Sequence, residues 1–101
     1  MFMKIHTSEK NSVLAICDKE LIGRKLKGKN IYLDLETYAS FYKGLPVNER
    51  AVLLAAAEAT SFNLVGEKSI ELMSRLKLLS AKEKKFIKKI QGVPHLQLYR
   101  I

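Results

Sequence analysis

The chain has 101 residues, of which 48% are hydrophobic, so we expect one buried core and a single domain spanning residues 1–101. Its 18 lysine and arginine residues exceed its 10 acidic residues by 8, which favours a polyanionic partner and says nothing about the fold. The chain has one cysteine and no apolar run of about 20 residues that could span a bilayer, so we expect a cytoplasmic protein with no membrane partner.

Strand-like patterns dominate the first half of the chain. Apolar-rich runs at 3–7 and 12–17 flank a polar cluster, which predicts a β-hairpin. A short turn there would place His6 opposite about Val13 and Cys17 opposite about Phe2, too far apart for a catalytic pair. Cys17 has apolar neighbours, so we expect its thiol to be buried.

A third strand is predicted at residues 31–36, where apolar and polar side chains alternate. The segment 18–25 before it fits a turn or a short helix. Tyr38, Phe41 and Tyr42 have the spacing of one helical face, and we expect them to pack against the core helix rather than to stack on bases.

Two helices are predicted in the second half. Asn48 has the side chain of an N-cap, and alanine, leucine and valine then continue on most sides as far as Ala59. We therefore expect a core helix that is buried over most of its circumference. Gly66 predicts the end of this helical region, and residues 67–78 show the apolar face of a second helix.

The last part of the chain carries conflicting signals. Ser80 and Glu83 have capping-box spacing, which indicates a helix, whereas residues 87–91 also fit a strand. Residues 81–91 therefore fit either a helix or a strand. Residues 95–101 alternate as a strand. The pattern predicts an α+β fold: a small, mostly antiparallel sheet of the N-terminal hairpin, the third strand and the C-terminal strands, packed on two consecutive helices.

The excess positive charge lies in two blocks on either side of a middle stretch without net charge. Their basic residues are Arg24, Lys25, Lys27, Lys29, Lys82, Lys84, Lys85, Lys88 and Lys89. Tyr32 follows the first block and could stack on a base while the lysines contact phosphates. If the second block is helical, Lys82, Lys85 and Lys89 line one face, with Phe86 anchored opposite. Solvated, purely solubilising loops are the alternative interpretation.

A possible specific polar site consists of Asn63, His95 and Gln97. A turn before His95 would fix its direction, and Gln97 would project from the same strand face. The sequence shows no nucleophile with a base in reach and no CxxC or HxxxH spacing, so we predict no catalytic residues, no metal site and no cofactor.

Short motifs in a fixed order carry a resemblance to a known family. They are Lys4–His6, Glu20–Gly23, Phe41–Gly44, Asn63–Glu67 and Gly92–Gln97. Through them nearly the whole chain resembles a small archaeal family catalogued as domain of unknown function 424. The resemblance implies an archaeal cytoplasmic α+β protein with a strand immediately before Gly92, so we expect a brief helical turn followed by a strand in 81–91. It implies no activity.

We expect a non-catalytic RNA-binding or ribosome-associated accessory protein of translation, which contacts phosphates through its lysine clusters. The alternative is a protein interaction module, or a subunit of a larger assembly, with an acidic partner. A third possibility is a small ligand-binding protein or enzyme that uses His95. The sequence carries no signal for an oligomeric state.

Overall fold

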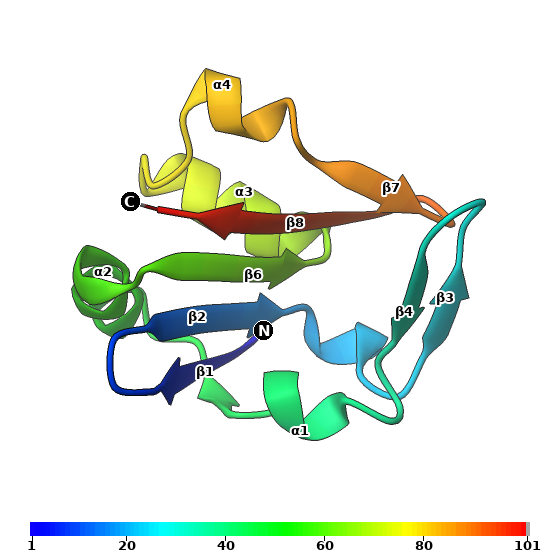
Figure 1. The fold of residues 1–101 in the computed structure, drawn as a ribbon, viewed down its shortest axis with the longest axis horizontal. Helices are drawn as coiled ribbons and strands as arrows, with labels where there is room; N and C mark the ends of the chain where they lie inside the picture. The colour runs from blue at the N-terminus through cyan, green and yellow to red at the C-terminus, as the bar shows by residue number, and fades with distance from the viewer. Residues whose placement is uncertain (101) are drawn as a thin grey trace.

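The computed structural model describes residues 1–100 and shows an α+β fold built on a six-stranded mixed sheet (Figure 1). The strand order is β5-β1-β2-β6-β8-β7, in which only the β2–β6 pair is parallel. The strands are β1 (Phe2–Thr7), β2 (Ser12–Cys17), β5 (Leu45–Pro46), β6 (Ser61–Val65), β7 (Lys88–Ile90) and β8 (Val93–Tyr99).

The N-terminal hairpin is confirmed, including its register. β1 and β2 pair antiparallel with His6 opposite Val13 and Phe2 opposite Cys17. Cys17 is fully buried, as its apolar neighbours indicated. The polar cluster between the strands forms the turn, which is closed by a hydrogen bond from the Ser8 backbone N–H to the Asn11 carbonyl.

The strand β6 was not expected from the sequence. Helix α2 (Glu49–Glu58) begins at Asn48, whose side chain accepts a hydrogen bond from the Ala51 N–H, and it ends where Ala59 turns extended. The chain then enters β6 and pairs with both β2 and β8. Two consecutive helices were therefore the wrong prediction, because a central strand separates α2 from α3 (Glu67–Arg75).

Helices α2 and α3 cover one face of the sheet, behind it in Figure 1. The largest buried cluster lies there and includes Leu14, Ile16, Val52, Phe62, Leu64, Leu72, Met73 and Leu96. Our expectation that α2 is buried on most sides was wrong. Only Val52 and Ala56 of this helix are buried, while Leu53 and Leu54 are exposed, because a helix lying on a sheet contacts it along one stripe.

A second, smaller cluster lies on the opposite face of the sheet. Its cover is a separate antiparallel hairpin of β3 (Lys25–Lys27) and β4 (Tyr32–Asp34), together with the short α1 (Ala39–Tyr42). The segment left open in the sequence is the 3-10 turn Lys19–Leu21. The predicted third strand thus forms in a shorter version, but it pairs outside the main sheet.

The three aromatic residues around α1 do not pack against the core helix. Tyr42 is buried and Phe41 half-buried in the second cluster, on the face opposite to α2, while Tyr38 is exposed. Local spacing predicted that these side chains share a helix face, but which side of the sheet receives that face depends on long-range packing.

Asp18 caps α3 from a distant part of the chain. Its buried carboxylate accepts hydrogen bonds from the Lys68 N–H at 3.1 Å, the Ser69 N–H at 2.8 Å and the Ser69 hydroxyl at 2.7 Å. Gly66 precedes the helix with φ 108°, and a Cβ there would lie 2.2 Å from Asp18 Cγ. Gly66 therefore starts α3 rather than ending α2, and only glycine fits beside the capping carboxylate.

The capping box of Ser80 and Glu83 is confirmed, and so is the brief helical turn followed by a strand. Helix α4 (Ala81–Lys84) ends too early for Lys82, Lys85 and Lys89 to line one helical face. Phe86 is exposed rather than anchored in the core. No helix within residues 1–100 is long and apolar enough to cross a membrane.

Candidate functional site

The sheet face opposite α2 and α3 is only partly covered and carries three neighbouring depressions. The depressions adjoin, because any two of them have a pair of lining residues in common. These pairs are Phe41 and Asn63, Gln97 and Leu98, and Tyr32 and Leu33. The largest has a volume of about 540 Å³, in the range of ligand-binding clefts. We call the three together the aromatic hollow. It is framed by α1, the β3–β4 hairpin and the segment from α4 to β7 (Figure 1).

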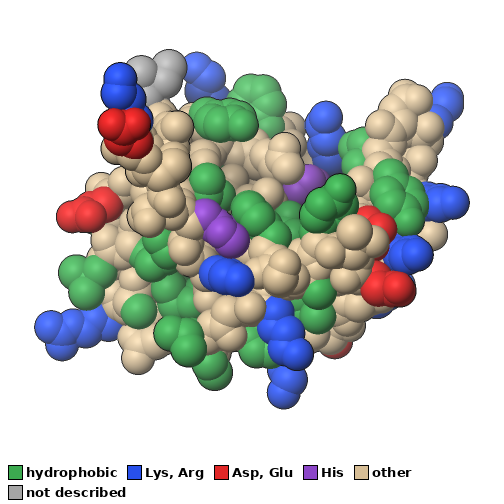
Figure 2. All heavy atoms as spheres, turned by 60° about the horizontal axis from the view of Figure 1, so that its bottom comes forward, with side chains coloured by type: hydrophobic (Ala, Val, Ile, Leu, Met, Phe, Trp, Pro, Cys, Tyr) green, Lys and Arg blue, Asp and Glu red, His purple; other side chains and the backbone are tan. Residues whose placement is uncertain are grey.

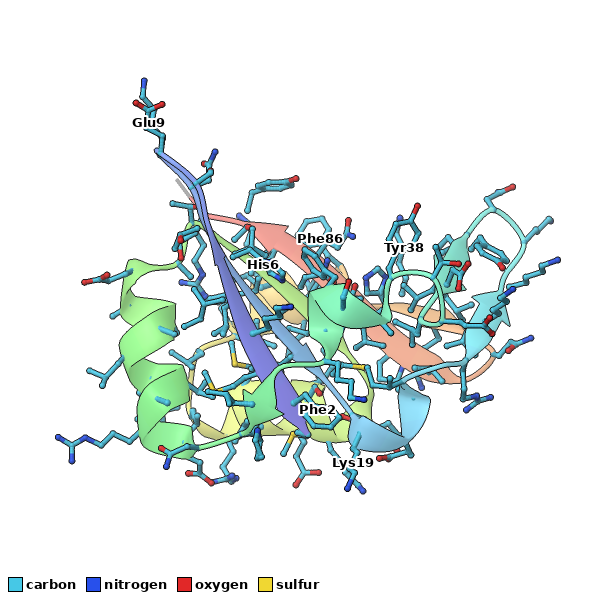
Figure 3. The ribbon with its side chains drawn as sticks, turned by 90° about the horizontal axis from the view of Figure 1, so that it is seen from below. Phe2, His6, Glu9, Lys19, Tyr38 and Phe86 are labelled. Carbon is cyan, nitrogen blue, oxygen red and sulfur yellow. The ribbon has the colours of Figure 1, made fainter. Side chains whose placement is uncertain are left out.

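Every exposed aromatic ring of the chain borders this hollow. The exposed fractions are 50% for Tyr32, 63% for Tyr38, 62% for Phe86 and 85% for Tyr99. Figure 3 shows Tyr38 and Phe86 projecting on the side of the sheet away from α2 and α3. The other aromatic side chains, Phe2, Phe41, Tyr42 and Phe62, are half-buried or buried. Exposed rings are thus gathered at one place rather than scattered over the surface.

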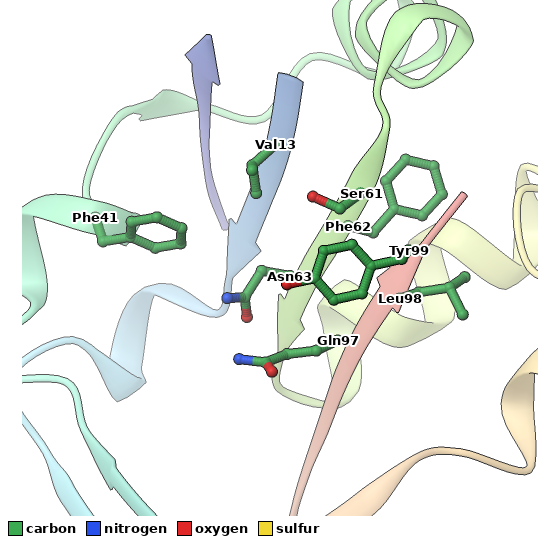
Figure 4. Close-up of a pocket in the computed structure, with 8 residues that line it drawn as sticks. All are labelled: Val13, Phe41, Ser61, Phe62, Asn63, Gln97, Leu98 and Tyr99. Carbon is green, nitrogen blue, oxygen red and sulfur yellow. The ribbon is translucent and has the colours of Figure 1, made fainter. Parts of the chain in front are cut away.

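Two side-chain amides form the floor of the aromatic hollow. Asn63 on β6 and Gln97 on β8 are direct partners in the antiparallel pairing, so their side chains lie next to each other on the same face. Figure 4 shows both amides pointing toward Phe41, with the ring of Tyr99 beside them. Neighbouring amides of this kind can donate and accept hydrogen bonds with a planar polar ligand.

Asn63 is held by two side chains from different elements. Its Oδ1 accepts a hydrogen bond from the Tyr42 hydroxyl at 2.9 Å and lies 3.3 Å from His95 Nε2. The structure therefore brings together Asn63, His95 and Gln97, which the sequence had suggested as a polar site. Residue spacing alone did not reveal Tyr42 as the residue that orients the amide, because the bond joins positions 21 residues apart.

Burial sets the protonation of these groups. It raises the pKa of Tyr42 to about 12, so the hydroxyl keeps its proton and can donate it. Burial also lowers the pKa of His95, assisted by the charge of Lys88, so the imidazole is neutral at pH 7. Burial and the neighbouring Asp18 raise the pKa of Cys17 to about 12, and a protonated thiol is not a nucleophile.

The second histidine holds α1 against the sheet edge. His6 Nε2 lies 2.8 Å from the Phe41 carbonyl oxygen, and the two rings stack with centroids 4.1 Å apart. Both histidines are visible on this face of the molecule in Figure 2, with hydrophobic side chains between them. Within residues 1–100, no group of three histidine, cysteine or acidic side chains is arranged to hold a metal ion.

The two lysine blocks meet only in part. The turn of the β3–β4 hairpin packs on the end of β7, since a Cβ at Gly28 would lie 3.5 Å from Ile90 Cγ2. Lys88 lines the aromatic hollow, and Lys27 Nζ sits 5.5 Å above the Tyr32 ring. Helix α4, which carries Lys82 and Lys84, stands away from the hairpin (Figure 1), so the two blocks do not form one continuous lysine face.

The lysines of both blocks remain available to a partner. In the described part of the chain the ion pairs are Lys68–Glu20, Arg75–Glu49 and Arg100–Glu83, and none uses a residue of either block. Figure 2 shows lysine and arginine side chains at several places along the edge of this face and one near its middle. The positive charge is therefore spread over this face instead of forming a separate site.

Phe86 and Tyr99 are site residues that the sequence analysis did not single out. A signal for Tyr99 was present, because it stands two residues after Gln97 on the same strand and must share its face. Phe86 carried no comparable signal. Its helical spacing indicated a buried residue, and it borders the hollow only because α4 ends at Lys84.

Comparison with known proteins supports the resemblance found in the sequence. Residues 6–101 match the profile of the family described as protein of unknown function (DUF424), and the chain belongs to this family. It is also similar to a solved structure, the crystal structure of an uncharacterized conserved protein from Methanopyrus kandleri. That comparison gives a TM-score of 0.76 at 29% identity and covers 99% of this chain and 90% of the other. No curated protein matches the chain.

Proposed function

We propose that this protein binds single-stranded RNA in the aromatic hollow and acts as a non-catalytic accessory protein of RNA metabolism or translation in the cytoplasm. The observation that carries the proposal is the gathering of Tyr32, Tyr38, Phe86 and Tyr99 around two amides on one sheet face. Unpaired bases offer flat faces to stack on such rings and polar edges to the amides between them.

Stacking explains why the rings are exposed. An exposed aromatic side chain forgoes the hydrophobic stabilisation that burial would give, so four in one hollow indicate a surface that a partner covers. Each base stacked on an aromatic ring contributes about 1–3 kcal/mol to binding. A duplex hides its base faces, so the hollow should favour single strands.

Lysines near the hollow supply the contribution from phosphates. Lys88 lies in its wall, and Lys27 and Lys29 lie in the adjacent hairpin. For single strands, each phosphate contact contributes about −0.7 to the slope of log affinity against log salt concentration, so three contacts give a slope of about −2. The distant lysines of α4 would add a weaker, non-specific attraction, so the site is centred on the hollow rather than on the lysine blocks that the sequence suggested.

The test is a fluorescence anisotropy titration with a labelled RNA of about ten nucleotides, single-stranded or annealed to its complement. Tyr99→Ala and Phe86→Ala should each weaken single-strand binding by about 1–3 kcal/mol. Leu54→Ala is the matched control, because Leu54 is also largely exposed, at 66%, but lies on α2, behind the sheet. Its affinity should equal that of the wild type.

A second pair of variants separates phosphate contacts from bulk charge. Lys88→Ala should reduce the salt slope by about 0.7, whereas Arg50→Ala, an exposed position on α2 behind the sheet, should leave it unchanged. No association of single-stranded RNA at low salt would refute the proposal. So would an equal loss of affinity in the hollow variants and in Leu54→Ala.

A protein interaction module is the second candidate, and a different surface supports it. An apolar depression of about 510 Å³ lies along the β1–β5 edge and is lined by Met3, Ile5, Leu45 and Ala51. Ile5 and Leu45 are exposed there. If this surface binds a protein, proteins captured from native lysate should stay bound after nuclease treatment, and the Leu45→Glu variant should not capture them. Captured proteins that are released by nuclease would count against this candidate.

A further inference from the structure

We infer that the outer edge of β1, from Ile5 to Thr7, binds a strand of a partner protein, and that this strand is an extended segment in which acidic side chains alternate with apolar ones. Strand addition at this edge is independent of RNA binding in the aromatic hollow. It specifies how the second surface, at the β1–β5 edge, would hold its partner.

The backbone of β1 has unpaired hydrogen-bonding groups along this edge. The Met1 carbonyl accepts a hydrogen bond from the Val47 N–H, on the side of β5. Backbone groups of alternate residues point to opposite edges of a strand, so those of Ile5 and Thr7 also point away from β2. β5 pairs with β1 only as far as Met3. Within residues 1–100, the outward N–H and carbonyl groups of Ile5 and Thr7 therefore have no strand beside them.

The other outer edges of the six-stranded sheet are protected against strand addition. β5 carries Pro46, whose nitrogen faces outward and cannot donate a hydrogen bond, and two of the three residues of β7 are lysines. Proline and lysine commonly prevent edge strands from pairing with another chain. Residues 5–7 include neither, and Ile5 and Thr7 are exposed. Figure 3 looks onto this edge and shows no other ribbon in front of the part of β1 that leads to Glu9.

An apolar side chain of the added strand would lie beside Ile5. Side chains opposite each other in neighbouring strands share one face of the sheet. Ile5 lies on the face that α2 covers, and with Met3, Leu45 and Ala51 it lines the apolar depression of about 510 Å³. Ile5 is 47% exposed and Leu45 is 75% exposed, so this depression is open to a partner. The residue of the added strand that pairs with Ile5 would cover these side chains.

The charged side chains around this edge are mainly basic. Lys4 lines the depression, and Lys43 and Arg50 are exposed in the segments that form its wall. In the part of the chain that the structure describes, none of these three residues belongs to an ion pair. The acidic residues of α2 are Glu58, at its far end, and Glu49, which an ion pair already neutralises. The excess of positive charge favours an acidic segment and opposes the pairing of two copies of this edge.

The test is a fluorescence anisotropy titration with a labelled peptide of about ten residues, blocked at both ends, in which glutamate alternates with valine. The wild type should bind this peptide. Thr7→Pro should weaken binding at least about tenfold, because the proline ring removes an outward N–H and occupies the place of the added strand. Thr7→Val keeps the N–H and should bind as the wild type does.

A second pair of variants tests the charge. Lys43→Glu should weaken peptide binding about threefold, because it replaces an attraction with a repulsion at the rim. Lys82→Glu is the matched control, since it makes the same change on α4, at the other end of the sheet (Figure 1), and it should bind as the wild type does. Equal losses in the two variants would show that only the net charge of the protein matters, and would overturn the choice of an acidic partner.

Amide hydrogen exchange provides a measurement that needs no variant. In the free protein the N–H groups of Ile5 and Thr7 should exchange fast and those of Lys4 and His6, which face β2, slowly, and the peptide should slow the first pair. Slow exchange of Ile5 and Thr7 without peptide would show that the edge is already covered. If this slow exchange appears together with a dimeric mass, the edge belongs to a second copy of the chain.

Either of these results would overturn the inference. So would a lack of peptide binding, or equal binding by Thr7→Pro and Thr7→Val. RNA binding is measured separately in the same variants, and Thr7→Pro should leave it unchanged, so failure of strand addition and failure of the proposed RNA function can be told apart.

Discussion

Replacing Asp18 with alanine should lower the free energy of unfolding by about 3 kcal/mol, because three hydrogen-bond donors lose their acceptor at once. The donors are the backbone N–H groups of Lys68 and Ser69 and the Ser69 hydroxyl, all within 3.1 Å of the carboxylate. Asp18 is only 3% exposed and Ser69 is fully buried, so water cannot readily replace the lost oxygens. At about 1 kcal/mol or slightly more for each donor left without its partner, the sum is about 3 kcal/mol.

Urea unfolding of the wild type, Asp18→Ala and Asp34→Ala provides the comparison. Asp34 also accepts two backbone N–H bonds, from Glu36 and Thr37, but in an exposed turn where water can take its place. Asp34→Ala should therefore destabilise the protein much less. Equal losses for the two variants would show that the buried cap does not stabilise α3 in the way described.

Three further predictions concern single side chains. Gly66→Ala should destabilise the protein more than Gly23→Ala in urea unfolding, since both glycines have positive φ but only at Gly66 is the Cβ position occupied; similar losses would contradict this. The free energy of unfolding should fall as pH drops below about 7, because the pKa of His95 is lowered from 6.5 only in the folded state and the unfolded chain therefore binds the proton more tightly. His95→Gln should lessen this fall. The same pH profile in the variant and the wild type would contradict a role of His95. Cys17, with a pKa of about 12, should react with a thiol reagent far more slowly in the native protein than after unfolding, and equal rates would contradict its burial.

Local patterns predicted the elements whose signals lie within a few residues. The hairpin, its register, the N-cap Asn48 and the capping box at Ser80 all follow from neighbouring side chains, and all are confirmed. Strand β6 was missed although Ser61 to Leu64 alternate between polar and apolar side chains, because five residues after an alanine-rich helix also continue a helical pattern. The parallel pairing with β2 that makes it a strand is a long-range interaction.

The candidate site was predictable only in part, for the same reason. His95 and Gln97 could be placed on one face from strand periodicity alone. Their meeting with Asn63 depends on the register of β6 against β8, and the orientation of the amide depends on Tyr42 from α1. Nothing within either segment specifies these contacts, so the hollow emerges only when the sheet is assembled.

The most direct test of the account is an NMR titration of the labelled protein with a short single-stranded RNA. The side-chain amide signals of Asn63 and Gln97 and the ring signals of Tyr99 should shift progressively with added RNA, because bases would cover these groups. Shifts confined to the lysines of α4, or no shifts at low salt, would contradict the central claim that the aromatic hollow is the binding site.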